Sequence, residues 1–284
     1  MIPAQFDYVK PSSLEEAVRA LASDEDAKVI AGGQSLLPLL RLRFAYPSVL
    51  VDLAGLDALR SVTDNGSSIE IGALVTHYEL TRDPLIAAHA GLLTEAAGTI
   101  ADPAVRHRGT IGGALSHGDA AGDLPAVVTA LDADLVITGP SGSRVLKPGD
   151  FFSDYLTTAL APDEILTAIR VPKLSGWGYA YEKFNVTAQA WAIVGVAAAV
   201  RRENGQVAEA RVGLTNMGSV PVRASAAEAA AAGADASPAA LAAAGARADE
   251  GTNPPEDLRA AADYRRHLAR VLTGRALTAA AGLS

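Results

Sequence analysis

Two glycine-containing segments hold the residues of this sequence that are best suited to bind a charged ligand. The first, Val29–Leu36, reads V-I-A-G-G-Q-S-L, and in it a predicted short buried strand, Lys28–Ala31, runs straight into Gly32–Gly33. Paired glycines leave backbone N–H groups unobstructed, and such groups can surround a phosphate. A tight turn between a strand and a helix, with a positive φ angle, is the simpler explanation of a single Gly32–Gly33 pair. The phosphate-binding interpretation therefore needs a second feature.

The second segment, Gly109–Asp123, supplies that feature. It repeats the glycine pair at Gly112–Gly113 after Thr110, and small residues then lead to the carboxylates Asp119 and Asp123. A wall of Gly, Ala and Ser lets a flat, extended ligand approach the backbone closely. Neither segment matches G-x-G-x-x-G or G-x-x-x-x-G-K-S/T, so the sequence supports neither a Rossmann dinucleotide site nor a P-loop.

The composition excludes several kinds of chemistry and several classes of ligand. The 284-residue chain has no cysteine, which excludes disulfides, thiol nucleophiles, iron–sulfur clusters and Cys-ligated zinc within it. Its five histidines form no HExxH or HxH pair, so we predict no metal site in this chain. A net charge of −8 argues against binding to nucleic acid or to an anionic membrane. No export signal is recognisable and no apolar run reaches the ~18–20 residues of a membrane span, so we expect a cytoplasmic protein.

The elements that position the two segments divide the chain into three parts. Residues 1–55 read as β-α-β alternation, in which Ser13 and Glu16 have the spacing of a capping box at the start of a helix. Residues 56–175 read as hairpins and helices, and residues 176–284 as a strand meander followed by alanine-rich helices. We therefore predict an α/β (α+β) fold whose last part is a small antiparallel sheet backed by helices.

Three boundaries are predicted within these parts. A helical stretch is expected over residues 84–100, and a strand over residues 192–201. The last helix is expected to open at Pro254–Pro255, because proline is favoured in the first turn of a helix.

Five segments in a fixed order resemble one known family. They are FDYVKPSSLEEAV, AGGQSLLPLL, RGTIGGAL, DEILTAIRVP and YEKF, and they span the whole chain. In this order they resemble the FAD-binding (medium) subunit of the molybdenum hydroxylases, of the carbon monoxide dehydrogenase and xanthine dehydrogenase type. The resemblance implies a two-part flavin-binding domain of the vanillyl-alcohol-oxidase/PCMH type. Its two subdomains would be residues 1–55 and 56–175, and residues 176–284 would form the C-terminal domain of the medium subunit.

The resemblance also implies which residues contact the flavin. Ala31–Ser35 and Thr110–Gly113 would bind the pyrophosphate of FAD, and Asp123 would contact its sugar portion. Leu166 would touch the adenine or the ring system, and Lys183 would reach the flavin side of the pocket. The full set of implied contacts is Val29, Ile30, Ala31, Gly32, Gly33, Gln34, Ser35, Leu36, Ala101, Thr110, Ile111, Gly112, Gly113, Ala114, His117, Asp123, Leu166, Lys183 and Trp191.

Four positions of this set need comment. Gln34 stands where relatives often carry His or Thr, and Ala114 and His117 stand where relatives often carry Ser or Asn. We interpret His117 as a structural loop residue rather than a proton donor, and we predict no catalytic residue in this chain. A tryptophan at the start of an apolar strand is normally part of a core, but the resemblance favours contact between Trp191 and the isoalloxazine ring.

The function implied by the resemblance is electron transfer through non-covalently bound FAD. Covalent attachment commonly uses Cys or His, and the chain has no cysteine and no histidine in the AGGQS loop. The molybdenum cofactor and two [2Fe-2S] clusters would lie only in partner subunits, a large molybdenum subunit and a small iron–sulfur subunit. The clusters would deliver electrons to the FAD, and an external acceptor would remove them. The complex is expected to be a dimer of heterotrimers, with Gly118–Gly122 and Trp177 as candidate contacts to a partner.

Two alternatives remain at this point. A stand-alone flavin oxidase of the vanillyl-alcohol-oxidase type would need a substrate base beside the flavin, and the sequence shows no clear acid–base constellation. A scaffold that has lost its flavin would need damaged glycine loops, and both loops are intact. The substrate of the complex and the electron acceptor are not readable from this chain.

Overall fold

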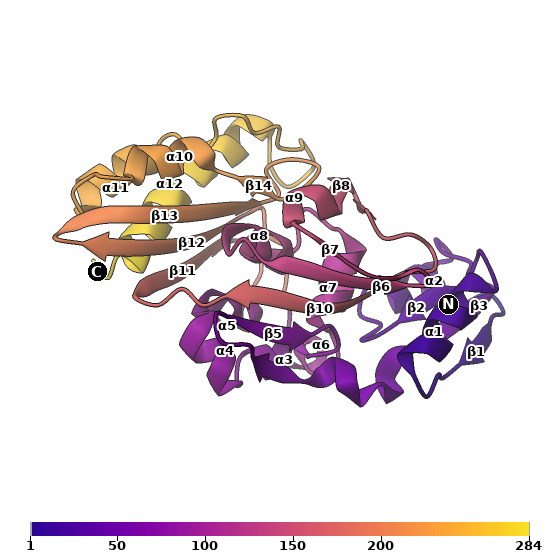
Figure 1. Ribbon diagram of the computed structural model, residues 1–284. Coiled ribbons are helices and arrows are strands. Elements are labelled where there is room, and N and C mark those ends of the chain that lie inside the picture. Colours follow the sequence, from indigo (N-terminus) through magenta and orange to yellow (C-terminus); the bar gives the residue numbers. More distant parts are fainter. Residues whose placement is uncertain (1, 284) are drawn as a thin grey trace.

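The computed structural model describes residues 2–283, and its three larger sheets follow one another along the chain (Figure 1). The first is a parallel sheet in the order β1-β3-β2, at the right of the figure. Its elements are β1 (Asp7–Val9), α1 (Leu14–Ala22), β2 (Lys28–Ile30), α2 (Leu36–Leu42) and β3 (Val49–Asp52). Ser13 caps α1 by accepting from the Glu16 amide, as the capping-box spacing predicts. Two short 3₁₀ turns, Leu53–Gly55 and Asp57–Arg60, lead into the second sheet.

The second sheet is antiparallel, with the strand order β4-β5-β10-β6-β7. Its strands are β4 (Val62–Asp64), β5 (Ser68–Gly72), β6 (Asp134–Gly139), β7 (Gly142–Leu146) and β10 (Ile165–Pro172). Between β5 and β6 the chain forms α3 (His77–Leu80), α4 (Pro84–His89), α5 (Gly91–Gly98), α6 (Pro103–Arg106), α7 (Ile111–His117) and α8 (Asp123–Ala130). After β7 come α9 (Pro148–Phe151) and the small pair β8 (Phe152–Asp154) and β9 (Thr157–Thr158). The central strand β10 carries a β-bulge between Leu166 and Ala168.

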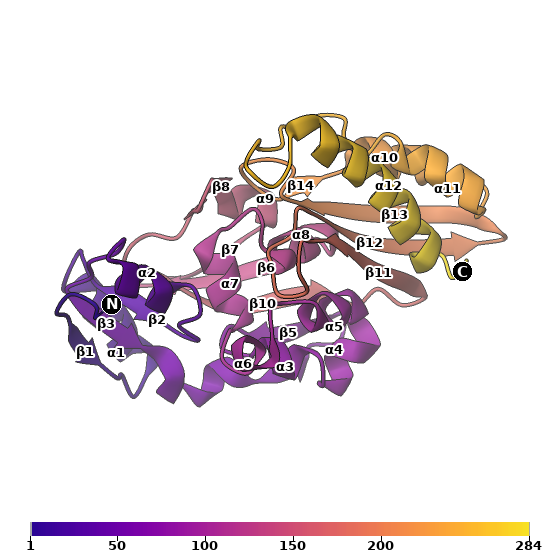
Figure 2. The same cartoon turned by 180° about the vertical axis from the view of Figure 1, so that it is seen from behind.

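The third sheet is antiparallel in the order β11-β12-β13-β14 and has helices on both faces. Its strands are β11 (Trp177–Phe184), β12 (Val194–Glu203), β13 (Gln206–Thr215) and β14 (Val222–Arg223). Figures 1 and 2 show α10 (Ser225–Ala231), α11 (Pro238–Gly245) and α12 (Ala262–Ala280) over one face. Helices α5 and α8 pack on the strands from the side of the second sheet. Burial on both faces explains why residues 194–200 form an uninterrupted apolar run.

Three predicted boundaries were wrong. The stretch over residues 84–100 is two helices, because the chain turns at Ala90 between α4 and α5. The last helix begins at Ala262 rather than at Pro254–Pro255, because the Asp257 carboxylate accepts from the amides of Arg259 and Ala260 and holds a turn there. Strand β12 begins at Val194 rather than at residue 192.

The alanine-rich helices pack closely against α12. A Cβ atom on Gly245 of α11 would lie 2.7 Å from the Cα of Gly274 of α12. Such an approach of two backbones requires glycine at the contact. No helix within residues 2–283 is long and apolar enough to cross a membrane.

Candidate cofactor site

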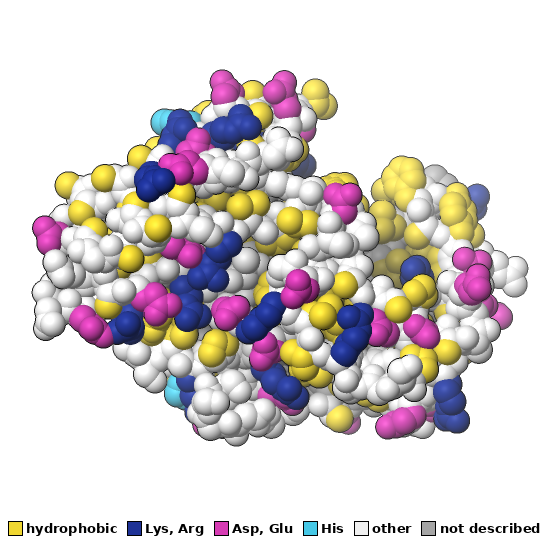
Figure 3. Space-filling view, turned by 45° about the horizontal axis from the view of Figure 1, so that its top comes forward, with side chains coloured by type: hydrophobic (Ala, Val, Ile, Leu, Met, Phe, Trp, Pro, Cys, Tyr) yellow, Lys and Arg dark blue, Asp and Glu magenta, His cyan; other side chains and the backbone are white. Residues whose placement is uncertain are grey.

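A cavity of about 630 Å³ lies where the first sheet meets the helices of the second. In Figure 3 the surface is hollowed between the N-terminal part, at the right, and the rest of the molecule. Every residue implied as a flavin contact lines this cavity except Ile111. The Ile111 side chain is fully buried in the core of the second part, so it supports the loop from behind.

The first glycine loop joins β2 to α2. Its geometry agrees with both interpretations of the sequence, a tight turn and a phosphate-binding loop. Gly33 adopts a φ of 73°, so the loop is a tight turn that favours glycine. Within residues 2–283, the backbone N–H groups of residues 32–36 donate to no protein acceptor. A loop with several unengaged N–H groups facing a cavity is suited to bind an anionic group such as a pyrophosphate.

The second glycine loop is organised differently. Ile111 N–H donates to the Val75 carbonyl at 3.0 Å, and Gly112 N–H donates to the Ala73 carbonyl at 2.8 Å. Gly113 N–H donates to Thr110 Oγ1 at 3.1 Å. These three donors are engaged by the protein, in contrast to the N–H groups of residues 32–36.

The glycines of both loops are also required by packing. A Cβ atom on Gly112 would lie 2.5 Å from the Cβ of Ala73. A Cβ atom on Gly32 would overlap the carbonyl oxygen of Arg108 and lie 2.7 Å from the Cα of Gly109. The two loops are therefore pressed backbone to backbone, a contact that the sequence pattern did not reveal.

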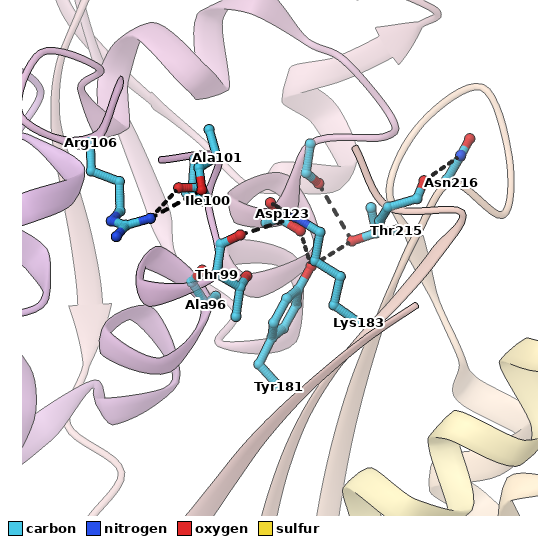
Figure 4. Close-up of polar contacts among 12 residues, drawn as sticks. Ala96, Thr99, Ile100, Ala101, Arg106, Asp123, Tyr181, Lys183, Thr215 and Asn216 are labelled. Carbon is cyan, nitrogen blue, oxygen red and sulfur yellow. Dashed lines mark hydrogen bonds and ion pairs between the residues drawn. The ribbon is translucent and has the colours of Figure 1, made fainter. Parts of the chain in front are cut away.

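A buried ion pair forms another part of the cavity wall (Figure 4). Lys183 Nζ on β11 donates to Asp123 Oδ2 at 2.9 Å, and each side chain is only 5% exposed. Tyr181 Oη donates to Asp123 Oδ1 at 2.6 Å. Burial raises the pKa of Asp123, although Lys183 and Tyr181 act in the opposite direction. The Asp123 carboxylate thus joins α8 to the third sheet.

Tyr181 was missed by the sequence analysis. It lies two residues before Lys183, so both side chains point to the same face of β11. This alternation along the strand is the signal in the sequence that could have identified Tyr181. Burial, with the Asp123 carboxylate adding to it, raises the pKa of Tyr181 well above its usual value, so the phenol stays protonated and donates.

The turn at Ile100–Ala101 is held by an arginine. Ala101 has a φ of 42°, which is unusual for a residue other than glycine. Arg106 Nη1 donates to the carbonyls of Ile100 at 2.8 Å and Ala101 at 3.2 Å, so the side chain fixes this turn against the cavity (Figure 4).

Trp191 lies in the loop between β11 and β12, where it lines the cavity and is 45% exposed. It is therefore a rim residue rather than the first residue of a core strand. Asn216 Nδ2 donates to the carbonyl of Ala192 at 2.9 Å and to that of Ile193 at 3.3 Å, which holds the end of this loop. Leu166 also lines the cavity and is buried at the bulge of β10.

The candidate partner contact at Gly118–Gly122 stays a prediction, and within the chain this segment is largely buried. Gly118, Ala120 and Gly122 are buried within the chain. The Ala120 carbonyl accepts from the Asn216 backbone N–H, so the segment supports the end of β13, while Asp119 and Ala121 remain partly exposed.

His77 is a second residue that the sequence analysis missed. Its imidazole lines the cavity and is 5% exposed. Burial lowers the pKa of His77 to about 4, and the nearby Arg106 charge adds to this effect, so the imidazole is neutral at pH 7. The sequence around it carries no motif that would have identified it.

Comparisons with known proteins agree with this architecture along the whole chain. The family described as "FAD binding domain in molybdopterin dehydrogenase" matches residues 4–174, and "CO dehydrogenase flavoprotein C-terminal domain" matches residues 179–280. The carbon monoxide dehydrogenase medium chain of Hydrogenophaga pseudoflava is 40% identical over 282 residues, which is 99% of this chain and 98% of the relative.

Two solved structures are equally similar in fold. One is carbon monoxide dehydrogenase from Hydrogenophaga pseudoflava that lacks the Mo-pyranopterin moiety of its molybdenum cofactor, with a TM-score of 0.96, 42% identity, and coverage of 100% of this chain and 99% of that chain. The other is quinoline 2-oxidoreductase from Pseudomonas putida 86, with a TM-score of 0.96, 33% identity and the same coverage of both chains.

Fold, cavity and similarity together define a flavoprotein subunit with an FAD-binding domain and a C-terminal antiparallel sheet backed by helices. The chain belongs to the medium-chain FAD subunits of the molybdenum hydroxylases, and it is part of an oxidoreductase. The unengaged N–H groups of the first loop and the cavity that both glycine loops line fit FAD.

Proposed function

We propose that this chain is the electron-transfer subunit of a heterotrimeric molybdenum hydroxylase. Electrons would reach its FAD from two [2Fe-2S] clusters of a small partner subunit and leave to an external acceptor. Molybdenum chemistry would take place in a large partner subunit, within a dimer of heterotrimers in the cytoplasm. The observation that carries the proposal is the cavity lined by both glycine loops, in a chain that matches medium-chain relatives over 99% of its length.

The residues of this chain would bind and orient the cofactor, while bound FAD supplies the redox chemistry. The N–H groups of residues 32–36 would hold the pyrophosphate, as the implied contacts suggest. Leu166 and Ala101 would contact a ring system, and Trp191 would shield the flavin from the rim of the cavity. Asp123 holds Lys183 Nζ in place, so a fixed N–H donor would border the flavin side.

We also propose three domains with boundaries near residues 55 and 175. The three separate sheets support this division. The cavity is lined mainly by the first two parts, and the third contributes Lys183 and residues 189–191. We propose that the large partner subunit determines the substrate, because relatives named for carbon monoxide and for quinoline share this fold with a TM-score of 0.96.

The proposed function is tested by dye reduction. The purified single chain, loaded with FAD, is expected to show no substrate-dependent reduction of an artificial acceptor, because no metal centre of its own would feed the flavin. The chain co-expressed with the neighbouring genes for its two partners is expected to reduce the dye. Robust substrate oxidation by the single chain would instead support the stand-alone flavin oxidase.

Non-covalent attachment of FAD is expected. Acid precipitation of the loaded protein should release all yellow colour into the supernatant, because the chain contains no cysteine. Two histidines, His77 and His117, do line the cavity. Colour retained in the pellet would contradict the expectation, and its loss in His77→Ala or His117→Ala would identify the attachment point.

A further inference from the structure

The backbone of His77 is fixed tightly while its side chain is not. Thr76 and Glu79 form a capping box at the start of α3, in which Thr76 N–H donates to Glu79 Oε2 at 2.7 Å. His77 N–H donates to the Gly109 carbonyl at 2.9 Å. Neither imidazole nitrogen has a hydrogen-bond partner among residues 2–283, and Nδ1 is fully buried. The position of the ring is therefore set by the backbone and by packing alone.

The ring lies directly against the contact between the two glycine loops. A Cβ atom on Gly109 would lie 2.8 Å from His77 Nε2 and 2.8 Å from Cδ2, so the absence of a side chain at Gly109 makes room for the imidazole. Gly109 in turn touches Gly32 of the first loop, where a Cβ atom would lie 2.7 Å from the Gly109 Cα. His77 thus borders the cavity at the place where the unengaged N–H groups of residues 32–36 begin.

An unpaired polar group in such a place is costly. Buried polar groups in native proteins nearly always have hydrogen-bond partners, and each exception asks for an explanation. A neutral imidazole has one donor and one acceptor. Leaving them unpaired would lower stability without benefit unless a bound ligand supplies the partner. The ligand of this cavity is FAD, and its pyrophosphate offers only acceptor oxygens.

We propose that His77 anchors FAD by donating an imidazole N–H hydrogen bond to an oxygen of the pyrophosphate, at the contact between the two glycine loops. The inference rests on FAD binding by this chain and not on the route of the electrons. It adds a side-chain donor to a site whose other donors are backbone N–H groups of the first loop.

The test uses the full-length apoprotein and two ligands. FAD and ADP share the pyrophosphate, and only FAD has the flavin ring. His77→Leu fills a similar volume with an apolar side chain that has no hydrogen-bonding group. We expect it to raise the Kd for FAD, measured by flavin fluorescence, on the order of tenfold, and the Kd for ADP by a similar factor. His77→Gln restores an N–H donor and is expected to recover part of the loss.

The thermal stability of the apoprotein separates anchoring from a structural role. The Tm of apo His77→Leu is expected to equal or exceed that of the wild type, because the variant no longer buries unpaired nitrogens. His267→Leu, at an exposed position on α12, is the matched control and should change neither Kd.

Three results would overturn the proposal: wild-type FAD affinity in His77→Leu, loss of FAD affinity with unchanged ADP affinity, or loss of affinity together with a marked fall in apoprotein Tm. A wild-type apoprotein that bound neither ligand would overturn FAD binding itself.

Discussion

Asp123→Ala is expected to lower the free energy of unfolding by about 3–5 kcal/mol, because it leaves a buried lysine without its counter-charge. Lys183 is 5% exposed, and without Asp123 its ammonium would keep only the Thr99 carbonyl, at 3.3 Å, as an acceptor. Tyr181 would lose its acceptor as well. Urea unfolding of the apoprotein measures the effect directly.

Two comparisons make this measurement specific. Asp64→Ala removes an ion pair with Lys173 of similar length at the surface, and it should cost at most about 1 kcal/mol. The double variant Asp123→Leu/Lys183→Met removes both buried charges and should regain most of the stability lost by Asp123→Ala. An Asp123→Ala protein as stable as Asp64→Ala would show that water reaches Lys183 freely.

Gly32→Ala is expected to abolish FAD retention. The added methyl group would overlap the Arg108 carbonyl, and backbone atoms cannot move aside as a flexible side chain can. The two glycine loops would have to separate, which displaces the N–H groups of the first loop from the cavity. Overpacking of this kind costs typically 1–3 kcal/mol in stability as well. Flavin absorbance after gel filtration reports retention, and apoprotein Tm reports the packing cost.

Gly98→Ala is the matched control. Gly98 ends α5, is exposed, and has open space around its Cβ position, so alanine should leave FAD retention unchanged and stability equal or slightly higher. A Gly32→Ala protein that retained FAD like Gly98→Ala would show that the close contact of the loops is not needed for binding.

Local patterns in the sequence predicted much of the fold. The capping-box spacing of Ser13 and Glu16 predicted the start of α1, and the Asp64–Gly66 turn signal predicted the hairpin of β4 and β5. Family resemblance placed both glycine loops and Lys183 at one site, and the structure brings them to one cavity. These features depend on neighbours within a few residues or on motifs that are recognisable one at a time.

What the sequence could not show depends on contacts between distant segments. Gly112 looked like a phosphate-binding glycine, but its N–H is engaged by Ala73, a residue that no local pattern connects to it. Tyr181 belongs to the YEKF segment but was assigned no role, and no motif marks His77. Their importance appears only when burial and partners are known. The start of the last helix was predicted too early. Pro254–Pro255 indicated a helix start, but the Asp257 carboxylate holds a turn there.

The cavity has a consequence for the life of the protein in the cell. It is lined both by the small parallel sheet's loop and by residues of the second part, so a bound cofactor would hold these two parts together in addition to their own contacts. A ligand at 100 times its Kd adds about 2.7 kcal/mol to stability. Newly made chains that find no FAD should therefore open first at this boundary and be degraded by proteases. The abundance of the subunit would then follow the flavin supply of the cell, and unloaded chains would be removed before they enter a complex that could not pass on electrons.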